Sequence, residues 1–249
     1  MSERNITRIA MWSGPRNIST AMMRSFGARA DAIVVDEPFY AAYLDRTGLE
    51  HPMRAEIIAD GETDADKVAA WLSGPLPEGK SVFYQKHMTH HMIPSMPRGW
   101  IDNVENAFLI REPERVLASY VVKRESVELT DIGFVAQAEI FGQVADRLGK
   151  APPVIAASDV RANPRSTLAQ LCERLGIAFD DAMLSWKPGI HESDGIWASH
   201  WYHQVEQSTG FAPPAATEEP LPDLPTDLQR IADEARPYYE RLAAHRITP

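Results

Sequence analysis

The stretch "MWSGPRNISTAMMRSF", residues 11–26, combines residue types that bind anions. An apolar run ends at Trp12, a glycine–proline pair breaks it, and an alanine- and methionine-rich helical pattern follows. A turn between a strand and a helix offers backbone N–H groups to an oxyanion, and this one also carries a guanidinium and two hydroxyls. We therefore expect a phosphate-bearing ligand to bind at Gly14, Pro15, Arg16, Asn17, Ser19 and Thr20. The alternative is an ordinary strand–helix connection with a serine N-cap.

The same turn lacks the usual nucleotide-binding signature, G-x-x-x-x-G-K-[ST]. Gly14 is followed at the right distance by Ser19 and Thr20, but there is no Gly-Lys pair between them, and Arg16 is the only cation inside the turn. This departure counts against an ATP-using kinase or hydrolase. One feature favours that rival, because "AIVVDEP" resembles a hydrophobic strand that ends in a metal-binding acid, Asp36.

A second candidate site lies in "FLIREPERVLASYVVKR", where Arg111 follows a buried strand and Ser119 comes about two helical turns later. In an open α/β sheet, ligands bind outside the carboxyl ends of the strands. Arg111 is therefore expected at the same rim as the first turn. The alternative is that Arg111 forms a structural ion pair with Glu112 or Glu114.

A third candidate is "VFYQKHMTHHM", in which a strand runs into Lys86 and three histidines. Histidine titrates near neutral pH and can take a proton from an acceptor hydroxyl. No regular spacing with a carboxylate or cysteine completes a metal site, so no metal is expected. The irregular, Trp-rich segment 185–211 is either a lid over a ligand or a long loop whose aromatic side chains pack on the core.

The composition indicates an ordinary globular protein. Hydrophobic residues make up 44% and charged residues 24% of 249 residues, enough for one sizeable α/β domain. The formal net charge of −10 argues against a nucleic-acid or anionic-membrane surface. A single cysteine, Cys172, fits a reducing cytoplasm. The sequence has no secretory apolar segment at its start and no run of about 18 apolar residues, so no membrane span is expected.

Short apolar runs alternate with helical patterns along the chain. The expected strands cover 6–12, 32–35, 81–85, 106–110 and 154–157, and the expected helices cover 19–29, 65–72, 114–123, 132–148, 165–175 and 226–245. This alternation predicts a P-loop-type, three-layer α/β fold, with a central, mostly parallel sheet flanked by helices. We expect one domain over 1–212, with a proline-rich segment and a C-terminal helix over 213–249 packed on it.

Together, these motifs resemble the cytosolic-type sulfotransferase superfamily over most of residues 6–200. "REPERVLAS" resembles the family element R-x-P-x-x-x-x-x-S, which binds a 3′-phosphate, and "ASDVRANPRSTLAQLCERLGI" resembles its E-D-L…N-P…L-x-x-L-G-I segment. "EPF" at 37–39 is similar to the strand end on the acceptor side of many bacterial members. The family's K-T-H element is spread over "KHMTH", so its register is ambiguous, and its late R-K-G loop is only faintly echoed by 187–189 and 194–197.

The resemblance implies sulfuryl transfer from 3′-phosphoadenosine-5′-phosphosulfate (PAPS), without a metal, to a hydroxyl or amine of a small-molecule acceptor. The first turn would bind the 5′-phosphosulfate, with Arg16 where the best-known members have lysine, and Arg111 and Ser119 would bind the 3′-phosphate. The implied catalytic residues are Arg16, Lys86 and one of two candidate bases, His87 or His90. The implied acceptor-binding residues are Glu37, Phe39 and Trp197.

Two alternative functions remain open from the sequence. The first is an ATP-dependent kinase or hydrolase, and the second is a nucleotide-binding module without catalysis. The sequence is also compatible with a homodimer. Nucleic-acid and membrane partners are not expected, and the acceptor itself is not readable.

Overall fold

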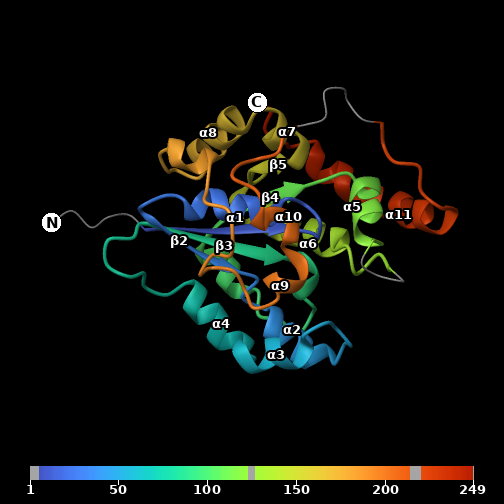
Figure 1. Cartoon of the computed structure of the whole chain (residues 1–249), viewed down its shortest axis with the longest axis horizontal. Helices are drawn as coiled ribbons and strands as arrows, with labels where there is room; N and C mark the ends of the chain where they lie inside the picture. The colour runs from blue at the N-terminus through green and yellow to red at the C-terminus, as the bar shows by residue number, and fades with distance from the viewer. Residues whose placement is uncertain (1–5, 123–126, 214–219, 249) are drawn as a thin grey trace.

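Five parallel strands form one sheet in the order β2-β3-β1-β4-β5 (Figure 1). The computed structural model describes residues 6–122, 127–213 and 220–248. The strands are β1 (Thr7–Ser13), β2 (Ala32–Asp36), β3 (Val82–Met88), β4 (Glu105–Ile110) and β5 (Val154–Ala156). β3 is buried along its whole length, as expected of a strand in a parallel sheet that is covered on both faces. The predicted fold class is confirmed, and β3 runs three residues beyond its predicted end.

Helices cover both faces of the sheet. Met22, Phe26 and Leu168 belong to the core on one face, beneath α1 (Ser19–Gly27) and α8 (Pro164–Arg174). The core on the other face includes α4 (Ala65–Leu72) and α6 (Phe134–Leu148). In Figure 1, α2, α3 and α4 lie below the sheet, and α7 and α8 lie above it. The remaining elements are α2 (Tyr40–Thr47), α3 (Arg54–Asp60), η1 (Thr89–His91), η2 (Gly99–Asn103), α5 (Pro113–Tyr120), α7 (Ala157–Ala162), η3 (Asp181–Leu184), α9 (Ala198–Trp201), α10 (His203–Glu206) and α11 (Thr226–Ala243).

The C-terminal helix α11 packs against α5 and α6 and buries Ile231, Ala232 and Ala235. Its packing face is therefore part of the same folded unit as the sheet. The domain boundary at 212/213 stays a prediction. Residues 214–219 of the proline-rich segment, and residue 123 at the predicted end of the helix that follows β4, lie outside the described residues.

The register of the sheet brings the chemistry-bearing residues to one rim. Asp36 at the end of β2 lies beside Lys86 of β3. Ser13 at the end of β1 lies beside Met88 on one side and Leu109 on the other. Because these strands are parallel and end together, the turns that follow them surround one common space.

Side-chain alternation along β3 separates two candidate catalytic residues. Lys86 faces the rim, whereas the side chain of His87 turns to the opposite face and into the core. There it stacks on Trp12 with ring centroids 4.6 Å apart and lies 5.1 Å from Trp100. Its Nε2 lies 3.2 Å from Oε1 of Gln85. Burial lowers the pKa of His87 to about 3.

We expect the free energy of unfolding to fall as pH drops from the ordinary histidine range toward the pKa of His87. In that window the unfolded chain binds a proton that the folded chain excludes, so acid favours unfolding by up to about 1.4 kcal/mol per pH unit for this group. Urea unfolding at about pH 7 and about pH 5 should show a smaller acid loss for His87→Gln than for the wild type. The exposed His245 supplies the control variant, His245→Gln, which should lose as much unfolding free energy between the two pH values as the wild type does. An equal loss in all three proteins would contradict the low pKa of His87.

Candidate functional site

The turn between β1 and α1 forms one wall of a cleft of about 330 Å³ at the carboxyl rim of the sheet. Arg16 and Ile18 have φ angles of 59° and 46°, in the left-handed region that non-glycine residues rarely adopt. Such conformations cluster at binding sites and can direct successive N–H groups to one side. The N-terminus of α1 follows at once and adds its free N–H groups. Five of the six predicted turn residues line the cleft, namely Pro15, Arg16, Asn17, Ser19 and Thr20.

Close packing behind the turn holds its shape. Gly14 does not line the cleft, and a Cβ there would lie 2.5 Å from the carbonyl oxygen of Ile132, so only glycine fits. Asn17 Nδ2 donates to the carbonyl of Leu109 at 2.8 Å. Nε2 of Gln137 donates to the carbonyls of Trp12 and Leu109 at 3.0 Å each. The Asn17 bond ties the turn to the end of β4, and the Gln137 bonds join α6 to the ends of β1 and β4.

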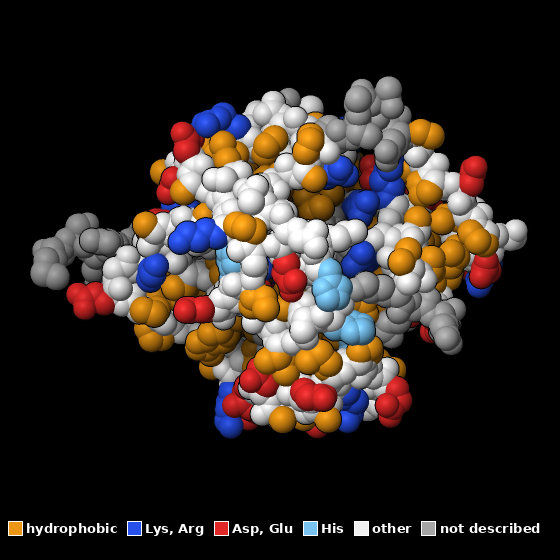
Figure 2. Space-filling view, in the orientation of Figure 1, with side chains coloured by type: hydrophobic (Ala, Val, Ile, Leu, Met, Phe, Trp, Pro, Cys, Tyr) orange, Lys and Arg blue, Asp and Glu red, His pale blue; other side chains and the backbone are white. Residues whose placement is uncertain are grey.

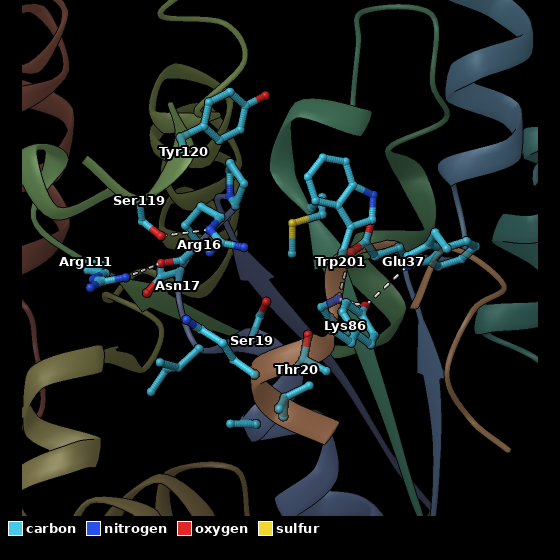
Figure 3. A pocket seen from close by; sticks show the side chains of 18 of the residues that line it. Arg16, Asn17, Ser19, Thr20, Glu37, Lys86, Arg111, Ser119, Tyr120 and Trp201 are labelled. Carbon is cyan, nitrogen blue, oxygen red and sulfur yellow. Dashed lines mark hydrogen bonds and ion pairs between the residues drawn. The ribbon is translucent and has the colours of Figure 1, made fainter. Parts of the chain in front are cut away.

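Arginine side chains gather at one end of the cleft (Figure 3). Arg16 Nε donates to Ser119 Oγ at 2.9 Å, and Arg111 Nη1 donates to the carbonyl of Arg16 at 2.6 Å. The motif around Arg111 and the first turn therefore meet in space, as the sequence predicted they would. Figure 2 shows basic side chains bordering a hollow on this face. We call this part of the cleft the basic end.

Arg161 also lines the basic end and was not singled out in the sequence. It comes from α7, and its side chain donates to the carbonyls of Ala212 and Pro213 at 3.1 and 2.9 Å. Burial lowers the pKa of Arg111, Glu112 opposes this, and the charges of Arg161, Arg115 and Arg16 lower the pKa further. Mutual repulsion among these arginines marks a place where a multiply charged anion would be stabilised.

A buried ion-pair cluster lies at the opposite end of the cleft. Lys86 Nζ donates to Asp36 Oδ1 and Glu37 Oε1 at 2.7 Å each and to the hydroxyl of Tyr202 at 2.6 Å. The Tyr202 hydroxyl in turn donates to Asp36 Oδ2 at 2.6 Å, and the backbone N–H of Gly195 donates to the same oxygen at 3.2 Å. Burial works against a charged Lys86, but the two carboxylates prevail and hold the pKa of Lys86 well above its usual value.

The histidines divide between the cleft and the core. His90 and His91 of η1 line the cleft, and His87 does not. His91 stacks on Tyr40 and Tyr43, with ring centroids 4.6 and 4.7 Å apart, and burial followed by the charges of its neighbours holds its pKa well below the usual range. Of the two bases considered from the sequence, the geometry therefore favours His90, and we leave His87 out of the site.

The predicted acceptor-binding residues are also divided. Glu37 and Trp197 line the cleft, whereas Phe39 is buried in the core beside His87 and Trp100. The alternation that turns His87 inward brings it against Phe39, which explains why neither reaches the cleft. Tyr40 and Tyr202, which the sequence analysis did not single out, and Trp201, from the Trp-rich segment considered as a lid, complete this end. Lys187 and Gly189, from the faint echo of the late R-K-G loop, are not among the cleft-lining residues.

The carboxylate that the kinase alternative would use is already engaged. Both oxygens of Asp36 accept hydrogen bonds from Lys86, Tyr202 and Gly195. In the described part of the chain, no group of three or more His, Cys, Asp or Glu side chains is arranged to hold a metal ion.

No described helix combines the length and apolar character needed to cross a membrane.

One curated relative matches nearly the whole chain. The branched-chain-amino-acid aminotransferase-like protein 1 of Arabidopsis thaliana is 34% identical over 240 residues, which is 95% of this chain but 42% of that relative. The chain therefore spans less than half the length of this relative, whose name describes the longer protein.

Two solved structures share the fold. The sulfotransferase domain from the curacin biosynthetic pathway is 17% identical with a TM-score of 0.54, over 94% of this chain and 99% of that one. A sulfotransferase from Alicyclobacillus acidocaldarius is 13% identical with a TM-score of 0.53, over 97% and 96%. The family model of the sulfotransferase domain matches residues 7–246. Since that match covers nearly the whole chain and agrees with the sheet and the turn described above, the chain belongs to the sulfotransferase domain family.

Proposed function

We propose that this protein transfers a sulfuryl group from PAPS to a hydroxyl or amine of a small-molecule acceptor. The observation that carries the proposal is the convergence of Arg16, Arg111 and Arg161 at one end of a cleft that also contains the N-terminus of α1. A nucleotide with phosphates at both the 3′ and 5′ positions suits this arrangement. Its 3′-phosphate would bind to Arg111, Arg161 and Ser119, and its 5′-phosphosulfate would bind at the turn, with Arg16, and at the start of α1.

In the proposed reaction the acceptor oxygen or nitrogen attacks sulfur in line with the leaving group. A bond from sulfur to the acceptor forms, the bond from sulfur to the bridging oxygen breaks, and adenosine 3′,5′-bisphosphate leaves with the electron pair. The acceptor proton passes to His90. Arg16 stabilises the negative charge that grows on the leaving phosphate, and Lys86, whose three N–H donors are taken by Asp36, Glu37 and Tyr202, contributes only through its charge. Catalysis then rests on positioning and electrostatics, with no oxidation or reduction.

A non-catalytic nucleotide-binding module would share the basic end but has no need of the rest of the cleft. Lys86 is held charged beside the site, and His90 lines the same cleft as the turn. This combination of a cation and a candidate base in one cleft favours an enzyme over a binding module.

Adenosine 3′,5′-bisphosphate should raise the melting temperature more than AMP does, with or without magnesium, because only the bisphosphate reaches the arginines through its 3′-phosphate. Arg161→Ala should weaken bisphosphate affinity roughly tenfold to a hundredfold, because it removes a charge-assisted contact to the 3′-phosphate. The affinity for AMP, which has no 3′-phosphate, should remain almost unchanged. Arg174→Ala, which removes an exposed arginine of α8, is the matched control. Calorimetry measures the affinities, and equal stabilisation by AMP and the bisphosphate would rule out a 3′-phosphate subsite.

His90→Ala should lower turnover roughly 10²–10⁴-fold while leaving bisphosphate affinity intact, because a positioned base acts on the chemical step. The assay is sulfuryl transfer from PAPS to a panel of alcohols, phenols and amines, using any acceptor that the wild type modifies. His245→Ala provides a control at an exposed histidine. Near-normal turnover of His90→Ala would exclude this histidine as the base.

Arg16→Ala should reduce single-turnover transfer roughly 10²–10³-fold, more than it reduces bisphosphate affinity, because a contact that strengthens in the transition state affects the rate constant most. Arg16→Lys should fall between, since the compact ammonium group of lysine lacks the planar fork with which a guanidinium contacts Ser119 and a second oxygen at fixed angles. A large loss of affinity with an unchanged transfer rate would instead make Arg16 a binding residue only.

A further inference from the structure

The two ends of the cleft differ in charge. The basic end carries Arg16, Arg111 and Arg161, whereas at the other end one lysine, Lys86, faces two carboxylates, Asp36 and Glu37. Tyr202 and His91, which contact this cluster, are neutral, because the pKa of Tyr202 lies well above its usual value and that of His91 well below. Among the described residues of this cluster, one negative charge is therefore left without a matching cation.

Glu37 is the group through which this excess charge reaches the cleft. Its backbone is held in the left-handed region at φ 41°, and its N–H donates to the carbonyl of Lys86 at 2.9 Å. Oε1 accepts from Lys86, whereas Oε2 lies 3.9 Å from Nε2 of His91, beyond hydrogen-bonding distance. The side chain keeps 11% of its surface exposed. Figure 3 shows Glu37 beside Lys86 and Trp201, across the cleft from Arg111 and Ser119.

Aromatic rings line the same cleft as this carboxylate. Tyr40, Trp197 and Trp201 all line the cleft. The rings of Tyr40 and Trp197 meet nearly at right angles, with centroids 5.0 Å apart, so they form two walls of a corner. Aromatic faces next to a carboxylate attract an organic cation both through the π electrons and through the full negative charge.

A neutral, apolar acceptor fits these surroundings poorly. It would pack on the rings equally well, but it would also cover Glu37 and remove water from a carboxylate that has only one cationic partner. Burial raises the pKa of Glu37 above its usual value, Lys86 opposes this and Asp36 adds to it, so the charged carboxylate is disfavoured in these surroundings. A cation placed at Oε2 removes this cost.

We infer that the acceptor is a small amino alcohol whose ammonium group binds against Glu37 and the rings of Tyr40, Trp197 and Trp201 while its hydroxyl receives the sulfuryl group. The inference rests on the proposed function and adds the substrate class. The cleft then binds two ligands of opposite charge, with the anionic donor at the arginines and the cationic acceptor at the carboxylate.

The test compares two alcohols of the same shape that differ in charge. Choline and 3,3-dimethyl-1-butanol, which has carbon in place of the nitrogen, are titrated by calorimetry into the protein saturated with adenosine 3′,5′-bisphosphate. Choline should bind roughly tenfold or more tightly than the neutral alcohol. Glu37→Gln should remove most of that difference, and Glu56→Gln, at an exposed glutamate of α3, should preserve it.

A second variant keeps the test independent of folding. Glu37→Gln takes a partner from the buried Lys86, so its melting temperature is measured first. Trp201→Leu keeps all four residues of the ion-pair cluster and removes the aromatic ring at this position, and it should weaken choline binding more than binding of the neutral alcohol. Loss of choline preference in Trp201→Leu alone supports the inference even if Glu37→Gln fails to fold.

Equal affinities for the two alcohols, or no saturable binding of choline, would overturn the inference. Binding of the bisphosphate is measured separately, and its absence would contradict the proposed function rather than the acceptor class. In that case the two alcohols are compared on the free protein, where the charge preference at Glu37 is still expected.

Discussion

The ion-pair cluster of Lys86 with Asp36, Glu37 and Tyr202 is the interaction on which the arrangement of the cleft depends. It joins β2, β3 and the segment that contains α9, which is distant in sequence. Burying a lysine is expensive, and removing one partner of a buried pair typically costs about 3–5 kcal/mol because the other charge is left uncompensated. The same bonds set the position of Glu37 and bring Trp197, whose Nε1 donates to the Tyr202 hydroxyl at 3.3 Å, to the cleft wall. Stability and site geometry are therefore coupled at one place.

Much of the fold and the basic end could be predicted from the sequence because they depend on local patterns. Apolar runs marked all five strands, and the spacing around Arg111 and Ser119 placed both at the rim of the first turn. Arg161 could not be found in this way, because α7 has only six residues and the position of Arg161 depends on how this short helix packs after β5. Tyr202 was missed for a related reason, since its role exists only through contacts with Asp36 and Lys86.

The ambiguity over the histidines had a simple physical source. The pattern predicted the end of β3 at Gln85, whereas the strand continues to Met88. In a strand, neighbouring side chains point to opposite faces, so this extension decides that His87 and Lys86 cannot share the cleft. Phe39 is placed by the same constraint, because it packs in the core on the side to which His87 turns. Sequence spacing alone gives no such information without the strand boundary.

Backbone strain is concentrated where the ligands would bind. Among the described residues, the non-glycine positions with left-handed φ are Arg16, Ile18, Glu37 and Met53, and the first three line the cleft. Each such position costs on the order of 1–3 kcal/mol, which the well-packed parallel sheet behind the rim must offset. This strain keeps the site preorganised, because donors and charges that are already fixed in place need no rearrangement when charge moves during the reaction. Arg16 and Glu37 lie at opposite ends of the cleft, so the strained positions fix its positive and its negative pole separately. The fold thus holds apart the two charges that an anionic donor and a cationic acceptor would each need.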